Sequence, residues 1–217
     1  MKLNNLLRKG VAEMMGVAIF VTAIIASELP DNGQINPIRN IAIGGTLALM
    51  ILITATISGG HLNPAVSLFM FARKSIDLST LIVFWIAQLL GGFIGLSIGT
   101  RMVNAPIVAD SSTFTDITGP LIGEVLATAV LIIIIVRLAS TKREAIIPFA
   151  VGLWVVVAST YTMTGAQANP AVTFALMLRD GFTQQHVAIV VAEFAGALIA
   201  LIYILLFDSE KKSKKKK

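Results

Sequence analysis

The sequence predicts an all-α membrane protein of six transmembrane helices and two re-entrant half-helices, arranged as two inverted repeats. Three observations support this prediction. The chain of 217 residues is 56% hydrophobic and 13% charged, with a mean hydropathy of +0.85, whereas soluble domains carry roughly 25% charged residues. Several apolar segments are long enough to cross a bilayer. One Asn-Pro-Ala motif occurs twice, each time before a short apolar run.

The first apolar segment follows Lys2, Arg8 and Lys9, as a signal peptide would. It carries Glu13 within its apolar run and has no convincing small-x-small cleavage site, so we expect a retained helix. We expect one transmembrane domain over 1–217, with repeats at about 10–100 and 119–207 and a Lys-rich tail at 208–217. The predicted membrane-crossing segments are about 10–27, 38–58, 78–100, 119–139, 145–163 and 184–207.

The two half-helices are predicted from the duplicated motif. Asn63-Pro64-Ala65 recurs as Asn169-Pro170-Ala171, 106 positions later (169 minus 63). Asn caps a helix with its side chain, and Pro fits the first helical turn, where its missing N–H costs nothing. The apolar run after each motif is about ten residues long, or ~15 Å, which is half the thickness of a bilayer core.

The repeat extends to the crossing segments. Glu13 in the first segment matches Glu124 in the fourth, and Gln88 in the third matches Glu193 in the sixth. Each half therefore reads helix, helix, half-helix, helix, and its odd number of crossings inverts the second copy. Glycines at spacings of three and four in the third segment predict a close helix–helix approach: Gly91, Gly92, Gly95 and Gly99.

The distribution of cations predicts the topology. With both termini in the cytoplasm, 14 of the Lys and Arg residues fall on the inner side, and only Arg39, Arg101 and Arg179 fall outside. This asymmetry follows the positive-inside rule. The net charge of +5 comes largely from six lysines among the last seven residues, so we interpret it as a topology signal with a solvated tail, not as a nucleic-acid site.

Irregular backbone at membrane depth is tolerated where it lines water or is buried in protein. The Gly-rich approaches to the two motifs are expected to turn their carbonyls into a lumen, while the Asn amides donate to a passing neutral molecule. Alternatively, the two Asn residues are only helix caps in a packed bundle. The expected carbonyl ladder comprises Gly59, Gly60, His61 and Leu62 in the first approach, and Gly165, Gln167 and Ala168 in the second.

The paired motifs, His61 in Gly-Gly-His-Leu-Asn-Pro-Ala, and a Glu in spans one and four resemble the aquaporin (major intrinsic protein) family. The resemblance covers essentially the whole chain. It implies a right-handed six-helix bundle, a homotetramer in the cell membrane with one pore per subunit, and passive flux of water or small neutral solutes. It implies no enzymatic activity, catalytic residue, metal or cofactor. It also implies that membrane lipid surrounds the protein as a partner.

The family's narrowest region, transferred by spacing from the motifs, falls on Ile43, Val157, Ala166 and Val172. Family members usually have Arg where this chain has Val172, and water-selective members have an aromatic and a His at the first two positions. We therefore expect a wider, apolar neck with no charge, no aromatic ring and no side-chain donor. Such a neck leaves open which solute passes: water, glycerol, ammonia, carbon dioxide or hydrogen peroxide.

The intramembrane acids leave a second hypothesis open. Ionisable groups within a membrane are often functional, so Glu13, Glu124 or Glu193 would serve a proton-coupled transporter. The symmetric placement of Glu13 and Glu124 favours a structural role instead, in which each carboxylate binds backbone N–H groups of a re-entrant loop. His61 is either a pH gate or a fixed hydrogen-bonding residue. A third hypothesis is a junction protein that conducts nothing.

Overall fold

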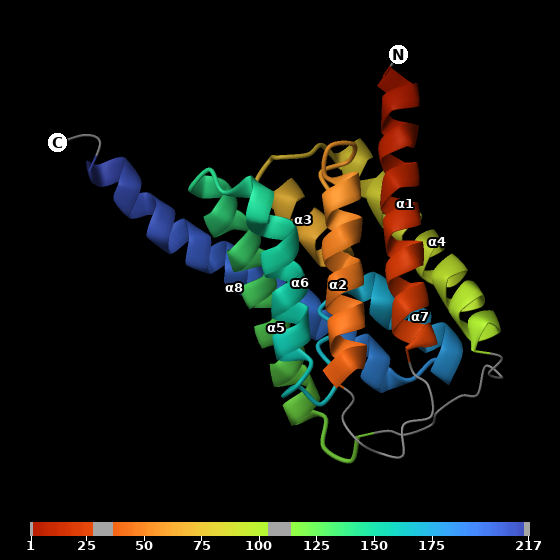
Figure 1. Cartoon of the computed structure of the whole chain (residues 1–217). Coiled ribbons are helices and arrows are strands. Elements are labelled where there is room, and N and C mark those ends of the chain that lie inside the picture. Colours follow the sequence, from red (N-terminus) through yellow and green to blue (C-terminus); the bar gives the residue numbers. More distant parts are fainter. Residues whose placement is uncertain (1, 28–36, 104–113, 215–217) are drawn as a thin grey trace.

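The structure is a computed structural model that describes residues 2–27, 37–103 and 114–214. Within these ranges the chain forms eight α-helices and one short 3-10 helix (Figure 1). In chain order they are α1 (Lys2–Ala26), α2 (Pro37–Thr54), α3 (Pro64–Ala72), α4 (Leu78–Met102), α5 (Thr118–Ser140), η1 (Glu144–Ile146), α6 (Ile147–Ala158), α7 (Pro170–Asp180) and α8 (Gln184–Lys214).

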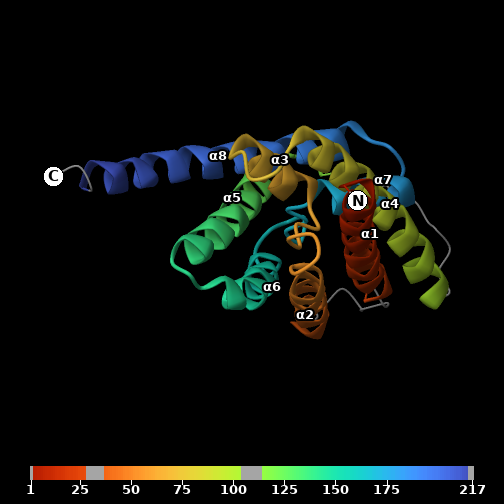
Figure 2. The ribbon, with the colours of Figure 1, turned by 90° about the horizontal axis from the view of Figure 1, so that it is seen from above.

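The helices repeat in the predicted order of helix, helix, half-helix, helix. In the first half α1 packs along α4, and in the second half α5 packs along α8 in the same way. The halves are joined where α2 packs against α6, and Figure 2 shows α2 beside α6 and α1 beside α4. This architecture confirms the predicted all-α bundle.

In the part of the chain that the structure describes, four helices are long and apolar enough to cross a membrane, namely α1, α4, α5 and α8. The other two, α2 and α6, are shorter than predicted. The segment expected over 145–163 ends its helix at Ala158. The hydroxyls of Ser159, Thr160 and Thr162 bond to backbone carbonyls three or four residues earlier, and such bonds compete with continuation of a helix.

The two half-helices are 9 residues (α3) and 11 residues (α7) long, about 14 and 17 Å. Figure 1 shows α3 in the upper half of the bundle and α7 in the lower half, with their amino-terminal ends meeting between. The start of α1 and the end of α8 lie toward the upper side (Figure 1). The first turn of α1 and the last turn of α8 are therefore on one side of the bundle.

Glycines set the distance between α4 and α1. A Cβ added to Gly91 would lie 2.5 Å from the Met14 carbonyl oxygen, and one added to Gly95 would lie 2.4 Å from that of Ala18. Such distances mean that the two helix backbones approach more closely than any residue with a Cβ atom would permit. The close approach predicted from the glycine spacing is confirmed.

A second close contact joins the two repeats. A Cβ on Gly44 of α2 would lie 2.4 Å from the carbonyl oxygen of Gly152 on α6, and the reverse distance is the same. The contact is reciprocal, so neither helix can move to make room for a side chain on the other. It fixes two helices that line the centre of the bundle.

We predict that Gly44→Ala lowers the free energy of unfolding by about 1–3 kcal/mol, because the added methyl group forces two helix backbones apart. Gly45→Ala is the matched control, since a Cβ at Gly45 meets nothing within 4 Å. The unfolding midpoint of the purified protein in detergent measures both variants. Equal midpoints for Gly44→Ala and Gly45→Ala would contradict this packing.

Candidate functional site

A buried carboxylate holds the approach to each half-helix. In the first repeat, Glu13 Oε1 accepts hydrogen bonds from the His61 N–H (3.0 Å) and the Ser58 hydroxyl (2.5 Å). Its other oxygen accepts from the Leu62 N–H (2.6 Å) and the Gln88 Nε2 amide (2.8 Å). Glu13 is fully buried, and without these four donors its charge would be costly.

Glu124 does the same in the second repeat. Its Oε1 accepts from the Gln167 N–H (3.0 Å) and from the Thr164 hydroxyl, and its Oε2 accepts from the Ala168 N–H (2.6 Å). Thr164 stands 106 positions after Ser58, and Gln167 and Ala168 stand 106 positions after His61 and Leu62. The carboxylate-to-loop bonds therefore follow the sequence repeat residue by residue.

The held segments are conformationally strained. Leu62 has φ of 48° and Ala168 has φ of 47°, a left-handed conformation that costs a residue with a Cβ about 1–2 kcal/mol. Gly59 and Gly60, also at positive φ, adopt such a conformation without that penalty. Leu62 and Ala168 each donate their N–H to Oε2 of the carboxylate of their repeat, so these bonds offset the strain at both positions.

The two Asn residues cap their own helices and bind the opposite loop. Asn63 accepts from the Ala65 N–H (2.8 Å), and Asn169 accepts from the Ala171 N–H (3.1 Å). Asn63 Nδ2 donates to the Ala168 carbonyl (2.7 Å), and Asn169 Nδ2 donates to the Leu62 carbonyl (2.9 Å). These crossed bonds join the inverted repeats at the centre of the bundle.

The crossed bonds change one expectation. The sequence predicted that both amide groups donate into a lumen, whereas one N–H of each is used on the opposite loop. Each Nδ2 carries two hydrogens, and the second has no acceptor among the described residues. One donor per Asn is thus left for a molecule at the centre.

The predicted carbonyl ladder is divided between two uses: two of its carbonyls accept the crossed bonds, and the others accept no described hydrogen bond. The carbonyls of Leu62 and Ala168 accept the crossed bonds. Among the described hydrogen bonds, none uses the carbonyls of Gly59, Gly60, His61, Gly165, Ala166 or Gln167, and these six residues line cavities in the bundle. Their role as acceptors along a permeation path stays a prediction.

Two cavities meet near the motifs. A wide cavity of about 320 Å³ is lined by Asn63 and Asn169 and extends to the η1 side of the bundle. A narrow cavity of about 100 Å³ lies on the other side and is lined by residues at the start of α2. Three residues line both cavities and define what we call the neck: Phe20, Val155 and Gln167.

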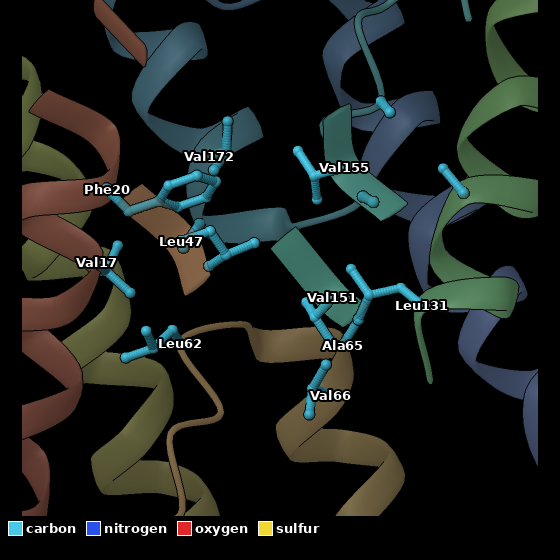
Figure 3. Packing of buried hydrophobic residues seen from close by; sticks show 14 of the residues in the cluster. Val17, Phe20, Leu47, Leu62, Ala65, Val66, Leu131, Val151, Val155 and Val172 are labelled. Atoms are coloured by element: carbon cyan, nitrogen blue, oxygen red, sulfur yellow. The ribbon is translucent and has the colours of Figure 1, made fainter. Parts of the chain in front are cut away.

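The lining of the narrow cavity differs from the predicted constriction at one helix, α6. Ile43, Ala166 and Val172 line the narrow cavity as expected from spacing, but Val157 lines neither cavity and is 44% exposed. Val155, two positions earlier and buried, lies at the neck instead. Figure 3 shows Val155 pointing toward the side on which Phe20 and Leu47 lie. Two positions along a helix turn a side chain by about 200°, so Val157 faces outward.

The sequence prediction also missed two residues. It expected no aromatic ring and no charge, but Phe20 lines the neck and Arg39 lines the narrow cavity. Helical spacing gives the signal for both. Phe20 stands seven positions after Glu13, and Arg39 stands four before Ile43, so each shares a helix face with a residue already assigned to the site.

The partners of His61 and Glu193 are also defined. His61 lines the wide cavity, with Nδ1 3.1 Å from the Ser67 hydroxyl and its ring edge-on to Phe84. Glu193 Oε1 accepts from the Asn169 N–H and the Thr173 hydroxyl, both at 2.8 Å. Glu193 thus supports the second half-helix as Gln88 supports the first loop. Neither cavity is lined by Glu13, Glu124 or Glu193.

Within the described ranges, no three His, Cys, Asp or Glu side chains are grouped so as to hold a metal ion. Beside the two motifs, the polar atoms of the site include amide donors and carbonyl acceptors placed along an apolar wall. Such a set binds neutral molecules that both donate and accept hydrogen bonds.

We predict that Glu13→Gln destabilises the protein by about 1–3 kcal/mol, because the new amide nitrogen faces donors and leaves buried N–H groups unpaired. Glu124→Gln is expected to have the same sign, since the two sites correspond. Glu144→Gln is the control because Glu144 is exposed. Thermal unfolding in detergent measures all three, and a wild-type midpoint for Glu13→Gln would argue against the carboxylate as the loop's main support.

Comparison with known proteins places this geometry in a family. The sequence model of the family "Major intrinsic protein" matches residues 1–146 and 112–216. The chain is 32% identical to the probable aquaporin TIP1-2 of Oryza sativa subsp. japonica, over 94% of this chain and 88% of the relative. It is 30% identical to the aquaglyceroporin AqpS of Rhizobium meliloti (strain 1021), over 91% and 88%.

Among solved structures, the X-ray structure of the aquaglyceroporin from Plasmodium falciparum is similar in fold, with a TM-score of 0.76 and 21% identity. The match covers 92% of this chain and 95% of that one. The sequence matches extend over both repeats, including both Asn-Pro-Ala motifs. The chain belongs to the major intrinsic protein family.

Proposed function

We propose that this protein is a passive channel for water and small uncharged solutes, and that one path per subunit runs through the two cavities. The observation that carries the proposal is that the wide cavity, lined by the paired Asn residues, and the narrow cavity share the three wall residues of the neck. Relatives of this chain are named aquaporin and aquaglyceroporin, which supports water and glycerol as the first solutes to test.

The path favours neutral molecules for a physical reason. The half-helices α3 and α7 direct their amino-terminal dipole ends at the centre, where they repel cations. A water molecule there accepts the remaining N–H bonds of Asn63 and Asn169, so its lone pairs are occupied. Water held in this orientation cannot continue a proton wire.

The proton-coupled transporter hypothesis is less well supported. A relay carboxylate must exchange its proton with the permeation path. The oxygens of Glu13 and Glu124 instead accept bonds from loop backbone and side chains, and none of the three acids lines a cavity. A structural role for Glu13 and Glu124 fits these contacts better.

Assembly and orientation belong to the same proposal. We propose a homotetramer in the cell membrane with both termini in the cytoplasm, which places the wide cavity on the inner side. The 14 inner against 3 outer cations support this orientation. Many large apolar side chains are exposed around the bundle, as lipid-facing or subunit-facing surfaces require.

Stopped-flow swelling of proteoliposomes tests the function. We expect water permeability well above protein-free vesicles, non-saturating in solute and independent of a proton gradient. Glycerol and ammonia are measured in parallel on the same vesicles. Saturating flux that responds to a proton gradient would favour the transporter, and absence of flux for every solute would favour a junction protein.

We predict that Val155→Ala raises the glycerol-to-water permeability ratio severalfold, because it removes two methyl groups from the neck and widens the passage for the larger solute. Val157→Ala is the matched control: it makes the same chemical change two positions away, where the side chain lines neither cavity. The two ratios are compared in the same swelling assay. A change in Val157→Ala without one in Val155→Ala would relocate the neck.

A further inference from the structure

Of the three buried glutamates that the structure describes, Glu193 on α8 has the fewest hydrogen-bond donors. Glu13 and Glu124 each accept bonds on both oxygens. Glu193 is fully buried, its two contacts are both on Oε1, and its Oε2 is buried without a hydrogen-bond partner. An ionised carboxylate in an apolar interior needs donors on both oxygens to replace water. The contacts of Glu193 therefore fit a neutral acid better than an anion.

The hydroxyl of Thr173 has more acceptors than hydrogens. Its oxygen lies 2.6 Å from Gln167 Oε1 and 2.8 Å from Glu193 Oε1. A hydroxyl carries one hydrogen, and the amide oxygen of Gln167 carries none. If Thr173 donates along the shorter contact, to Gln167, the hydrogen of its contact with Glu193 has to come from the carboxyl group. A proton on Glu193 Oε1 satisfies both contacts.

The packing of α8 on α5 repeats that of α4 on α1. A Cβ on Gly91 would lie 2.5 Å from the Met14 carbonyl oxygen, and one on Gly196 would lie 2.6 Å from that of Val125. Each of these glycines stands three positions after the buried polar residue of its helix, and each carbonyl belongs to the residue after the buried glutamate of the partner helix. The two helix pairs therefore share one register, so the buried polar residues of α4 and α8 correspond.

Gln88, the corresponding residue on α4, shows what a group in this place provides. Its Nε2 amide donates to Glu13 Oε2 (2.8 Å) and to the Ser67 hydroxyl (3.0 Å), and its Oε1 is buried without a partner. In the second repeat, Glu193 Oε1 contacts Thr173, which stands 106 positions after Ser67, and Oε2 has no partner. A protonated Glu193 reproduces both atoms of the amide, with its O–H in place of Nε2 and its carbonyl oxygen in place of Oε1.

The charged group that acts on Glu193 from a neighbouring helix is another acid. Of α3, α5 and α7, which pack against α8, α3 has no titratable side chain. Glu124 on α5 interacts electrostatically with Glu193, and the two bind adjacent N–H groups, those of Ala168 and Asn169. Two carboxylates so close in a low-dielectric interior are not both ionised. The other titratable side chains described on α5, α7 and α8 lie about two turns or more from Glu124, Thr173 and Glu193 along these helices: Arg137, Arg179, Asp180, His186 and Tyr203.

We propose that Glu193 is a neutral carboxylic acid at physiological pH, and that its O–H positions the second half-helix as the Gln88 amide supports the first loop. Loss of this proton would add a second negative charge beside Glu124 and remove the donor to Thr173. The same carboxyl group binds the Asn169 N–H, so the start of α7 is weakened at alkaline pH. The inference does not depend on the proposed channel function, because it concerns the folded state and not the flux.

Infrared spectroscopy of the full-length protein in detergent tests the protonation, because the C=O stretch of a neutral acid is separated from the bands of a carboxylate. At neutral pH we expect a neutral-acid band that is lost in Glu193→Gln. Glu144→Gln removes an exposed acid and should retain the band. Glu193→Asp keeps an acid on a shorter side chain, so it should shift the band, and it assigns the band if Glu193→Gln folds poorly.

The pH dependence of unfolding is the second readout. Between about pH 6 and about pH 9 an ordinary Glu is ionised in the unfolded chain, so a proton held only in the folded state makes stability fall as the pH rises. We expect the unfolding midpoint of the unmodified protein to fall by roughly 5 °C relative to that of Glu193→Gln across this range. Gln88→Glu places a second acid beside Glu13 and should add a fall of the same sign.

Three results would overturn the inference. The first is the absence of a neutral-acid band from the unmodified protein at neutral pH. The second is a band that persists in Glu193→Gln, which would place the proton on another carboxyl group. The third is a parallel change with pH in the midpoints of Glu193→Gln and the unmodified protein. A protein that shows the band but conducts neither water nor solute would refute the proposed function and leave this inference standing.

Discussion

The structure depends on finding partners for irregular backbone in the middle of an apolar bundle. Each loop before a half-helix exposes N–H groups that no helix satisfies, and unpaired groups at such depth cost several kcal/mol each. Glu13 and Glu124 supply the acceptors, and they hold Leu62 and Ala168 in left-handed conformations. Without these carboxylates the loop N–H groups that they accept from would lose their partners.

The same bonds explain why the two halves form one site. Once the loops are held, Asn63 and Asn169 each reach a carbonyl of the opposite loop. Every crossed bond therefore requires both repeats to be folded and in register. The close contact between Gly44 and Gly152 brings the pore-lining faces of α2 and α6 together from the other side.

The repeat is not exact, and its departures lie in the supports of the half-helices and in the linings of the cavities. Gln88 donates to Glu13, whereas its counterpart Glu193 accepts from the half-helix backbone. The cavities also differ: the wide one is lined by the acidic Glu144, and the narrow one by the cationic Arg39. Two similar halves thus enclose cavities with different linings.

Much of this arrangement could be predicted from the sequence, because it rests on local chemistry that repeats. Asn-Pro at a helix start, a short apolar run and a matching Glu in each half are visible without coordinates, and they predicted the half-helices and the two loop-holding acids. The resemblance to the family, carried over by distance from the motifs, pointed to Ile43, which lines the narrow cavity.

Only the tertiary structure decided which side chains form the neck. Val155, and not the predicted Val157, lies at the neck because packing against α2 sets the rotation of α6 about its axis. Two positions along the helix turn a side chain to nearly the opposite face. Phe20 and Arg39 share helix faces with Glu13 and Ile43, but packing between the helices decided that these two side chains line the cavities. The sequence by itself determined the half-helices and their supports, because those depend on neighbours in the chain or on an internal repeat. The width and charge of the passage depended on how separate helices pack, and that is settled only in three dimensions.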